Sequence, residues 1–368
     1  MQQSPMPEQP PLPSPPGSDV PVRQVQSLGP ARPPVASDRQ YAARVPAPVE
    51  ELLFEVKRLI VGQDRLLERL LVALLSGGHV LLEGVPGLAK TATVKAFADV
   101  IGGSAGRIQF TPDLVPADLV GTRIYNPARA EFNTELGPVF CNLLLADEIN
   151  RAPAKVQSAL LEVMQEKQVT IGKQSYRVPE PFLVLATQNP IETDGTYPLP
   201  EAQLDRFMLK VLVDYPSFAE EVVVVERITG PSIRLRQVIT VEQLSEMQRK
   251  VAEVYVDPVV RAYAATLVSA TRHAANMGLE QVAPAIAFGA SPRASINLVA
   301  AGRALAFMRG RSYVLPLDVA DVAPEVIRHR LVLTYQGIAA GVTAETIVWQ
   351  LLQRFPPPRL DLGDRVAS

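Results

Sequence analysis

Cysteine, histidine and tryptophan are scarce in this chain of 368 residues, which contains one cysteine, three histidines and one tryptophan. A single cysteine, Cys141, excludes a disulfide framework and a thiolate metal cluster. The histidines at positions 79, 273 and 329 lie far apart in the sequence, so we do not expect a zinc site.

An excess of charge of either sign is also missing, because the formal net charge is -2 and the sequence pI is about 6.0. This balance gives no bulk attraction to nucleic acid or to an anionic membrane. No segment approaches the roughly 20 apolar residues that span a bilayer, and no apolar signal-peptide core is found near the first residue. We therefore expect a cytoplasmic protein with no nucleic-acid partner and no membrane insertion.

Proline is abundant, and it divides the chain. Residues 1–46 are rich in proline and poor in large apolar side chains, which predicts a disordered tail with polyproline II character. This tail could dock a partner or could simply be solvated. Residues 356–368 predict a second flexible tail, and between the tails we expect an α/β domain over 47–228 and a helical domain over 229–355.

The stretch from His79 to Thr91, HVLLEGVPGLAKT, predicts a buried strand, a glycine-rich loop and the start of a helix. Backbone N–H groups of such a loop bind phosphate at a helix N-terminus. Lys90 would reach the β- and γ-phosphates, and the Thr91 hydroxyl would be a ligand of Mg²⁺. Ala89 stands where the usual pattern has glycine, and an ordinary strand-to-helix turn is the alternative. The candidate nucleotide-binding residues here are Gly84, Val85, Pro86, Gly87, Leu88, Ala89, Lys90, Thr91 and Ala92.

Two amphipathic helices are predicted before this loop, over 49–60 and 64–75. The tight turn between them, Val61-Gly62-Gln63, is a place where an adenine base could lie. A requirement of the turn itself would explain Gly62 equally well.

Carboxylates follow the second buried strand. The segment NLLLADEINR, residues 142–151, places a continuous apolar run before Asp147 and Glu148. At the carboxyl end of a strand in a parallel sheet, Asp147 could hold Mg²⁺ through water, and Glu148 could orient or deprotonate the water that attacks the γ-phosphate. The alternative is a strand that simply ends in charged residues.

Asn189 follows another predicted strand, over 182–186, and should lie at the same edge of the sheet as Glu148. It could hold the attacking water, or it could be a turn residue before Pro190. Arg206 is predicted near the end of a short helix over 199–207, ahead of a strand over 208–213. It could complete the site of a neighbouring subunit, or form a surface salt bridge.

Several further elements lie between these motifs. A strand is expected over 107–111, no regular element over 112–121, a polar hairpin over 125–137, a helix over 154–166 and a β-hairpin over 169–178.

After Thr229 the strand pattern stops, which predicts a small all-helical domain. Helices are expected after the capping box Thr240 to Gln243, over 258–271, from Ser291-Pro292 to about 308, over 317–329 with an interruption at Pro324, and over 344–355. Arg293 lies in the first turn of one helix, where the dipole disfavours a cation. An arginine at this position could contact an anionic partner such as a nucleotide phosphate, or it could simply be exposed to solvent.

The motifs GVPGLAKT, LLLADEINRAP, ATQNP, LPEAQLDRF and SPRA, in this order, resemble those of the MoxR group of AAA+ ATPases. The resemblance covers about residues 49–355. It implies an AAA+ αβα sandwich with a parallel sheet, a P-loop NTPase core, and a C-terminal all-helical lid domain, assembled into a ring that is often a hexamer. Ala89 is also similar to the residue found in that group.

The resemblance also implies roles for individual residues. Gly84, Gly87, Lys90 and Thr91 match the Walker A loop, and Asp147 with Glu148 match Walker B. Catalytic roles are implied for Glu148, Asn189 as sensor 1, Arg206 as arginine finger, and Lys90. Arg293 matches sensor 2, the turn 61–63 looks like the stretch beside the adenine, and Arg151 is similar to a proposed intersubunit arginine. Residues 112–137 resemble the helix 2 insert, and 169–178 the pre-sensor hairpin.

The implied function is Mg²⁺-dependent hydrolysis of ATP to ADP and phosphate at subunit interfaces. Proteins of this group look like chaperones that mature partner complexes, often with a partner bearing a von Willebrand factor A domain. One alternative is a nucleotide-dependent assembly scaffold with little turnover, which has no need of Glu148 or Arg206. A chelatase-like subunit or a nucleic-acid motor of the same clade is another, and the acidic balance disfavours the motor.

Overall fold

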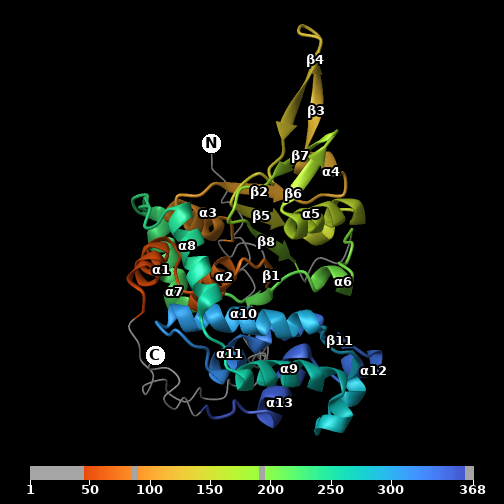
Figure 1. The fold of residues 1–368 in the computed structure, drawn as a ribbon. Coiled ribbons are helices and arrows are strands. Elements are labelled where there is room, and N and C mark those ends of the chain that lie inside the picture. Colours follow the sequence, from red (N-terminus) through yellow and green to blue (C-terminus); the bar gives the residue numbers. More distant parts are fainter. Residues whose placement is uncertain (1–44, 85–89, 190–194, 361–368) are drawn as a thin grey trace, which may run out of the picture. The chain divides into compact units, whose positions relative to one another are not determined.

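A five-stranded parallel sheet lies at the centre of the computed structural model, which describes residues 45–84, 90–189 and 195–360. The order across the sheet is β2-β5-β8-β1-β9, and Figure 1 labels the first four of these strands. The strands are β1 (Val80–Gly84), β2 (Ala105–Gln109), β5 (Leu143–Asp147), β8 (Leu183–Gln188) and β9 (Leu209–Val213). The predicted αβα core with a parallel sheet is confirmed.

The central strands β1, β5 and β8 are buried on both faces. Successive side chains of a strand point to opposite sides, so each face packs into a different apolar cluster. In β1, Val80 and Leu82 pack into one apolar cluster, whereas Leu81 packs into the other. The first cluster also contains the buried side chains of α1 (Ala47–Leu59), α2 (Asp64–Ser76) and α3 (Lys90–Ile101). The second contains those of α5 (Ala154–Glu166). The continuous apolar runs in the sequence therefore reflect burial from two sides.

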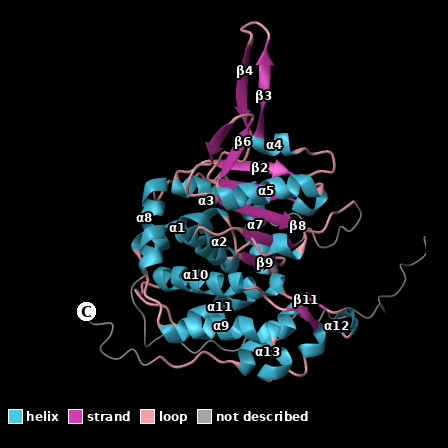
Figure 2. Cartoon of the chain, turned by 45° about the vertical axis from the view of Figure 1, so that its right-hand side comes forward, coloured by secondary structure: helices cyan, strands magenta, loops and turns pink. Residues whose placement is uncertain are grey.

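A short helix and one hairpin pack with α5 in the second cluster, whereas a second hairpin extends away from the sheet (Figure 2). The hairpins are β3 (Gly121–Asn126) with β4 (Glu131–Leu136), and β6 (Gln168–Ile171) with β7 (Gln174–Arg177), and both were predicted. The prediction of no regular element over 112–121 is wrong, because α4 spans Pro116–Val120. Pro116 occupies the first helical turn, and Asp118 accepts a hydrogen bond from the Val115 N–H at 2.9 Å, which caps the helix.

The C-terminal part of the chain is helical, as predicted. Its helices are α8 (Val241–Glu253), α9 (Pro258–Arg272), α10 (Pro292–Met308), α11 (Pro316–Ile327), α12 (Tyr335–Ala339) and α13 (Ala344–Arg354). It also contains the short 3₁₀ helices η3 (Ala274–Met277), η4 (Ala283–Ala285) and η5 (Arg328–Arg330). We call residues 241–354 the lid.

Two details of the C-terminal predictions are wrong, and one helix ahead of this part was not predicted. Strands do not stop entirely, because β10 (Ile286–Phe288) and β11 (Val332–Leu333) form an antiparallel pair. Helix α11 continues through Pro324, since Val322, Ala323 and Val326 are buried beside it and their packing offsets the lost backbone hydrogen bond. The sequence analysis also missed α7 (Phe218–Thr229), which begins at a capping box formed by Ser217 and Glu220.

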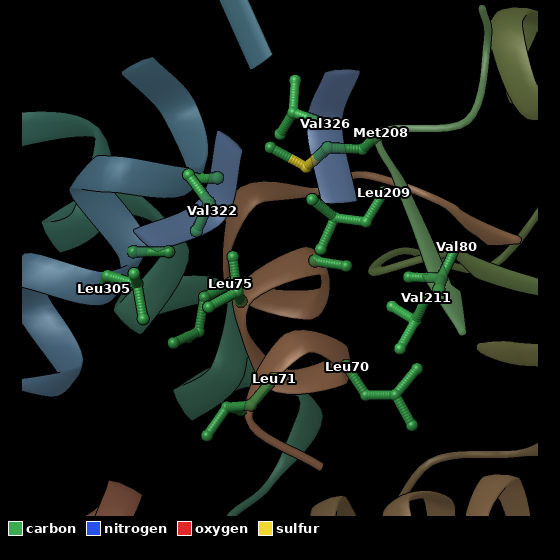
Figure 3. Packing of buried hydrophobic residues seen from close by; sticks show 14 of the residues in the cluster. Leu70, Leu71, Leu75, Val80, Met208, Leu209, Val211, Leu305, Val322 and Val326 are labelled. Carbon is green, nitrogen blue, oxygen red and sulfur yellow. The ribbon is translucent and has the colours of Figure 1, made fainter. Parts of the chain in front are cut away.

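Helix α2 is packed between the sheet and the lid. In Figure 3, Leu70, Leu71 and Leu75 of α2 lie among side chains from β1 and β9 and from α10 and α11 of the lid. On the same helix, Arg69 is fully buried, and it forms ion pairs with Glu68, Asp321 and Glu325 at 2.7, 3.0 and 3.4 Å. Apolar and ionic contacts therefore both join the lid to α2.

None of the helices in the described part of the chain combines the length and the apolarity that crossing a membrane requires.

Candidate functional site

The polar residues singled out in the sequence meet at the carboxyl edge of the sheet. Strand β8 is hydrogen-bonded to β5 on one side and to β1 on the other, and all three run in parallel. Their last residues, Asp147, Gln188 and Gly84, therefore lie at one edge. Because Ala146 pairs with Ala186, Asp147 and Thr187 are adjacent across the two strands. The expectation that Asn189 lies at the same edge as Glu148 is confirmed.

Lys90 is the first residue of α3, and its side chain returns toward the strand. Its ammonium donates a hydrogen bond to the Gly84 carbonyl at 2.9 Å. Burial lowers the pKa of Lys90, and the carboxylates of Asp147 and Glu148 act in the opposite direction. The lysine thus faces the two acidic residues across the edge where a phosphate would have to lie. Residues 85–89, which complete the predicted loop, lie outside the described residues, and so do residues 1–44 of the predicted tail.

Thr187 holds both carboxylate residues in place. Its hydroxyl donates to Asp147 Oδ1 at 2.6 Å and accepts from the Glu148 N–H at 2.9 Å. On its other side Asp147 accepts from Arg107 of β2 at 3.0 Å. Asp147 is therefore oriented from two neighbouring strands.

Glu148 adopts a left-handed backbone conformation, with φ 56° and ψ 50°. Residues other than glycine seldom adopt this conformation, and where it occurs it is often found at functional sites. The Glu148 carboxylate accepts a hydrogen bond from Arg151 at 3.1 Å. Asn189, directly after β8, is buried.

An apolar pocket of about 350 Å³ lies beside the start of α3. Its lining includes Ile60, Val61 and Gln63 from the α1–α2 turn, Ala92 from α3, and Ile228 from α7. Gln63 Oε1 is buried and has no hydrogen-bond partner within the described part of the chain. An adenine amino group is the kind of donor that this oxygen lacks, and the apolar walls suit a flat base.

Gly62 in the same turn has φ 63°, and a side chain there would collide with the Glu220 carboxylate at the start of α7. The positive φ of the turn therefore favours glycine here, whereas the Glu220 side chain is flexible and could move aside. The sequence analysis left two explanations of Gly62 open, and the geometry supports the one based on the turn.

The oxygen ligands at the edge suit magnesium. The Asp147 carboxylate and the Thr91 hydroxyl are hard ligands of the type that Mg²⁺ binds, and the Thr91 side chain is exposed at the start of α3. Lys90 and Thr91 follow the loop directly, so a triphosphate bound by that loop would reach both of them.

Arg206 and Arg293 lie together, away from these residues. Arg206 follows α6 (Glu201–Leu204) by two positions rather than lying within it, and its side chain makes no hydrogen bond or ion pair with the residues that the structure describes. Arg293 is half exposed at the N-terminus of α10, and its Nη1 lies 3.6 Å from Asp205 Oδ2. Arg293 therefore lies beside the residue that precedes Arg206 in the chain.

Thr187 and Arg107 were not identified from the sequence, although both contact Asp147. A signal for Thr187 was present, because it lies two residues before Asn189 at the end of a predicted strand. Arg107 offered no local signal, since its contact with Asp147 depends on the neighbouring positions of β2 and β5 in the sheet.

The fold and this edge of the sheet define an AAA+ ATPase. A profile of the ATPase family associated with various cellular activities (AAA) matches residues 79–209, and a profile of the AAA lid domain matches residues 279–351. The chain belongs to the MoxR family.

Membership rests on close relatives. The chain is 55% identical to Chaperone MoxR1 of Mycobacterium tuberculosis over 85% of its own length and 83% of the relative's. It is 35% identical to Protein MoxR of Paracoccus denitrificans, over 75% of this chain and 86% of that one. A crystal structure of a candidate ATPase from Cytophaga hutchinsonii shares 46% identity with a TM-score of 0.81, covering 85% of this chain and 95% of that chain.

Proposed function

We propose that this protein hydrolyses ATP to ADP and phosphate in a Mg²⁺-dependent reaction. The observation that carries the proposal is the position of Asp147 and Glu148 opposite Lys90, at the edge where β1, β5 and β8 end. The apolar pocket with the unpaired Gln63 oxygen lies beside the same helix start and supports binding of an adenine nucleotide.

Each residue of this edge has a proposed role. Lys90 binds the β- and γ-phosphates, and Thr91 and Asp147 would hold the magnesium ion, which supplies charge neutralisation on the phosphate oxygens. Glu148 accepts a proton from the attacking water, and Asn189 holds that water. The Thr187 hydroxyl keeps both carboxylate residues oriented toward this space.

We further propose that Arg206 and Arg293 act together on the nucleotide of a neighbouring subunit in a ring, which we take to be a hexamer. Support comes from their common position around Asp205, and from the absence of any contact between either arginine and Lys90, Asp147 or Glu148 in the described residues. An arginine that stabilises the transferred phosphoryl group accelerates turnover about 10³- to 10⁵-fold.

The cellular role that we propose is chaperone-like remodelling of a partner protein, and we expect that partner to bear a von Willebrand factor A domain. The name of the relative from Mycobacterium tuberculosis supports the chaperone role. We also propose a cytoplasmic location, and a boundary between core and lid near Thr229, where α7 ends.

The test is ATP turnover with Mg²⁺ by the wild type and by Glu148→Gln, with light scattering in the same samples. We expect turnover by the wild type, its loss in the variant, and ATP-dependent rings in both. A wild type that binds ATP and assembles without turnover would contradict the ATPase proposal and favour the scaffold. Stimulation of ATP turnover by DNA would favour the nucleic-acid motor. Co-purification of tetrapyrrole-pathway subunits would favour the chelatase-like subunit.

A further inference from the structure

A buried arginine of the lid, Arg330 in η5, contacts the chain on both sides of Arg206. Its guanidinium donates to the Asp205 carboxylate through Nε at 2.7 Å. Its Nη2 donates to the backbone carbonyls of Asp205 at 3.0 Å and Phe207 at 2.6 Å, and its Nη1 donates to that of Met208 at 3.3 Å. One side chain of the lid therefore holds the residue before Arg206 and the two residues after it.

These contacts are largely buried, although Asp205 and Arg330 also line a pocket of about 320 Å³. The Arg330 side chain is 1% exposed and that of Asp205 is 21% exposed. Burial lowers the pKa of Arg330 to about 10, and Asp205 acts in the opposite direction, so the guanidinium stays charged at neutral pH. A planar guanidinium that donates to a carboxylate and to several carbonyls fixes their relative positions more tightly than a lysine could.

Two further lid residues contact the same segment. The Ser291 hydroxyl donates to the Asp205 carboxylate at 3.0 and 3.1 Å, and His329 Nε2 lies 3.0 Å from the Phe207 carbonyl. The Arg206 side chain itself is left unpaired within the described part of the chain. The backbone that carries Arg206 is thus held firmly, while its guanidinium remains available.

We propose that Arg330 is a positioning residue for Arg206, through which the lid of one subunit sets how that subunit presents its arginine to the nucleotide of its neighbour. The proposal rests on the proposed function, because it takes Arg206 as the arginine that acts on an adjacent subunit. Arg330 acts through the backbone and through Asp205, and it touches no nucleotide. A displacement of about 1 Å at a reacting group can cost about 10²-fold in rate, so loosening this contact should reduce turnover in the neighbour.

The experiment uses rings of two kinds of full-length subunit. Arg206→Ala subunits keep Glu148 but supply no arginine, and Glu148→Gln subunits supply Arg206 but cannot hydrolyse ATP. Neither alone should turn over ATP, whereas a mixture should, because each Glu148→Gln subunit serves an Arg206→Ala neighbour. The test replaces the second kind with Glu148→Gln/Arg330→Lys, and we expect the recovered turnover to fall at least about tenfold.

The matched control is Glu148→Gln/Arg328→Lys. Arg328 belongs to the same 3₁₀ helix, is largely buried, and donates to a backbone carbonyl at 3.2 Å, but that carbonyl belongs to Lys210 in β9, beyond the Arg206 segment. Subunits with Arg328→Lys should restore turnover as well as the parent. Equal recovery of ATP turnover with the Arg330→Lys and the Arg328→Lys subunits would overturn the proposal. It would mean that Arg330 acts only within its own subunit's site or only on general stability.

Folding and assembly are checked by thermal melting and light scattering on every mixture. If Arg330→Lys fails to assemble, Asp205→Asn replaces it, since the amide keeps an oxygen for Arg330 Nε while removing the charge. A reduced recovery then supports the proposal, and a full recovery refutes it. If the parent mixture itself shows no recovery, the action of Arg206 on a neighbour is refuted first, and the role of Arg330 fails with it.

Discussion

Thr187 and Asp147 are joined across two parallel strands by a hydrogen bond of 2.6 Å, in which the hydroxyl donates to the carboxylate. The same hydroxyl accepts from the N–H of Glu148 at 2.9 Å. A single side chain of β8 therefore sets the orientation of the proposed magnesium ligand and of the proposed base. The proposed roles of Asp147 and Glu148 therefore both depend on Thr187.

Thr187→Val should reduce turnover while leaving nucleotide binding largely intact. Valine has nearly the same shape but cannot orient Asp147 or accept from Glu148, so we expect kcat to fall about tenfold to hundredfold. The measurement is steady-state kinetics together with the Kd for ATP. Thr170→Val, on the exposed β6–β7 hairpin, is the matched control, and it should leave kcat unchanged. An unchanged kcat in Thr187→Val would show that the hydroxyl does not orient the site.

Gln63→Asn should weaken binding of ATP. Asparagine tolerates the left-handed conformation of this residue, φ 55°, but is too short to present its oxygen at the same place in the pocket. We expect the Kd for ATP to rise about tenfold, which corresponds to the loss of one hydrogen bond of about 1.4 kcal/mol. Ala130→Asn, at φ 51° in the exposed β3–β4 turn, is the control. If the wild type, Gln63→Asn and Ala130→Asn bind ATP with equal affinity, the adenine does not bind in this pocket.

Arg69→Met should strongly destabilise the protein. Arg69 is fully buried, and its removal takes from Asp321 and Glu325 the cation that they share, although Arg309 still pairs with Asp321 and Arg65 with Glu325. Because both carboxylates keep one cation, we expect a loss near the lower end of the range for a broken buried ion pair, about 3 kcal/mol, and urea unfolding measures the change. Lys250→Met, which breaks an exposed pair with Glu246, should cost less than about 1 kcal/mol. Similar losses in the two variants would mean that the buried network contributes little.

The stability of the protein should fall as the pH drops from about 6.5 toward 4, in part because of His79. Burial lowers the pKa of this histidine from 6.5 to about 4, and its ring contacts the Met164 carbonyl at 3.1 Å and the Val184 N–H at 3.0 Å. The unfolded chain therefore binds a proton in this range while the folded chain does not, which favours unfolding by up to about 3 kcal/mol at pH 4.

His79→Asn should accordingly show a smaller decrease in the free energy of unfolding over this pH range, even if it is less stable at pH 7. Exposed His273→Asn is the control, and it should follow the wild type. Unfolding curves recorded at a series of pH values give the slopes. Parallel slopes for wild type and His79→Asn would contradict the assignment of this pH dependence to His79.

The local sequence patterns were enough to predict most elements. Helix α5 spans the predicted residues 154–166, and the turn at 61–63 lies where the helical periodicity breaks. Elements with weaker patterns were missed. Helix α4 is short and rich in proline and aspartate, and α7 buries none of its residues, so only the capping box at Ser217 marked its start.

What the sequence by itself determined is the set of elements and the residue types at their ends, because periodicity, capping and turn chemistry act between residues close together in the chain. Because the carboxyl ends of parallel strands share one edge, the position of Glu148 and Asn189 at the same edge was also predictable. Only the tertiary structure decided which strands are neighbours, and hence that Thr187 meets Asp147 and that Arg330 reaches Asp205 across 125 positions of sequence. Such contacts depend on the packing of the whole core and lid, since no short segment contains both partners.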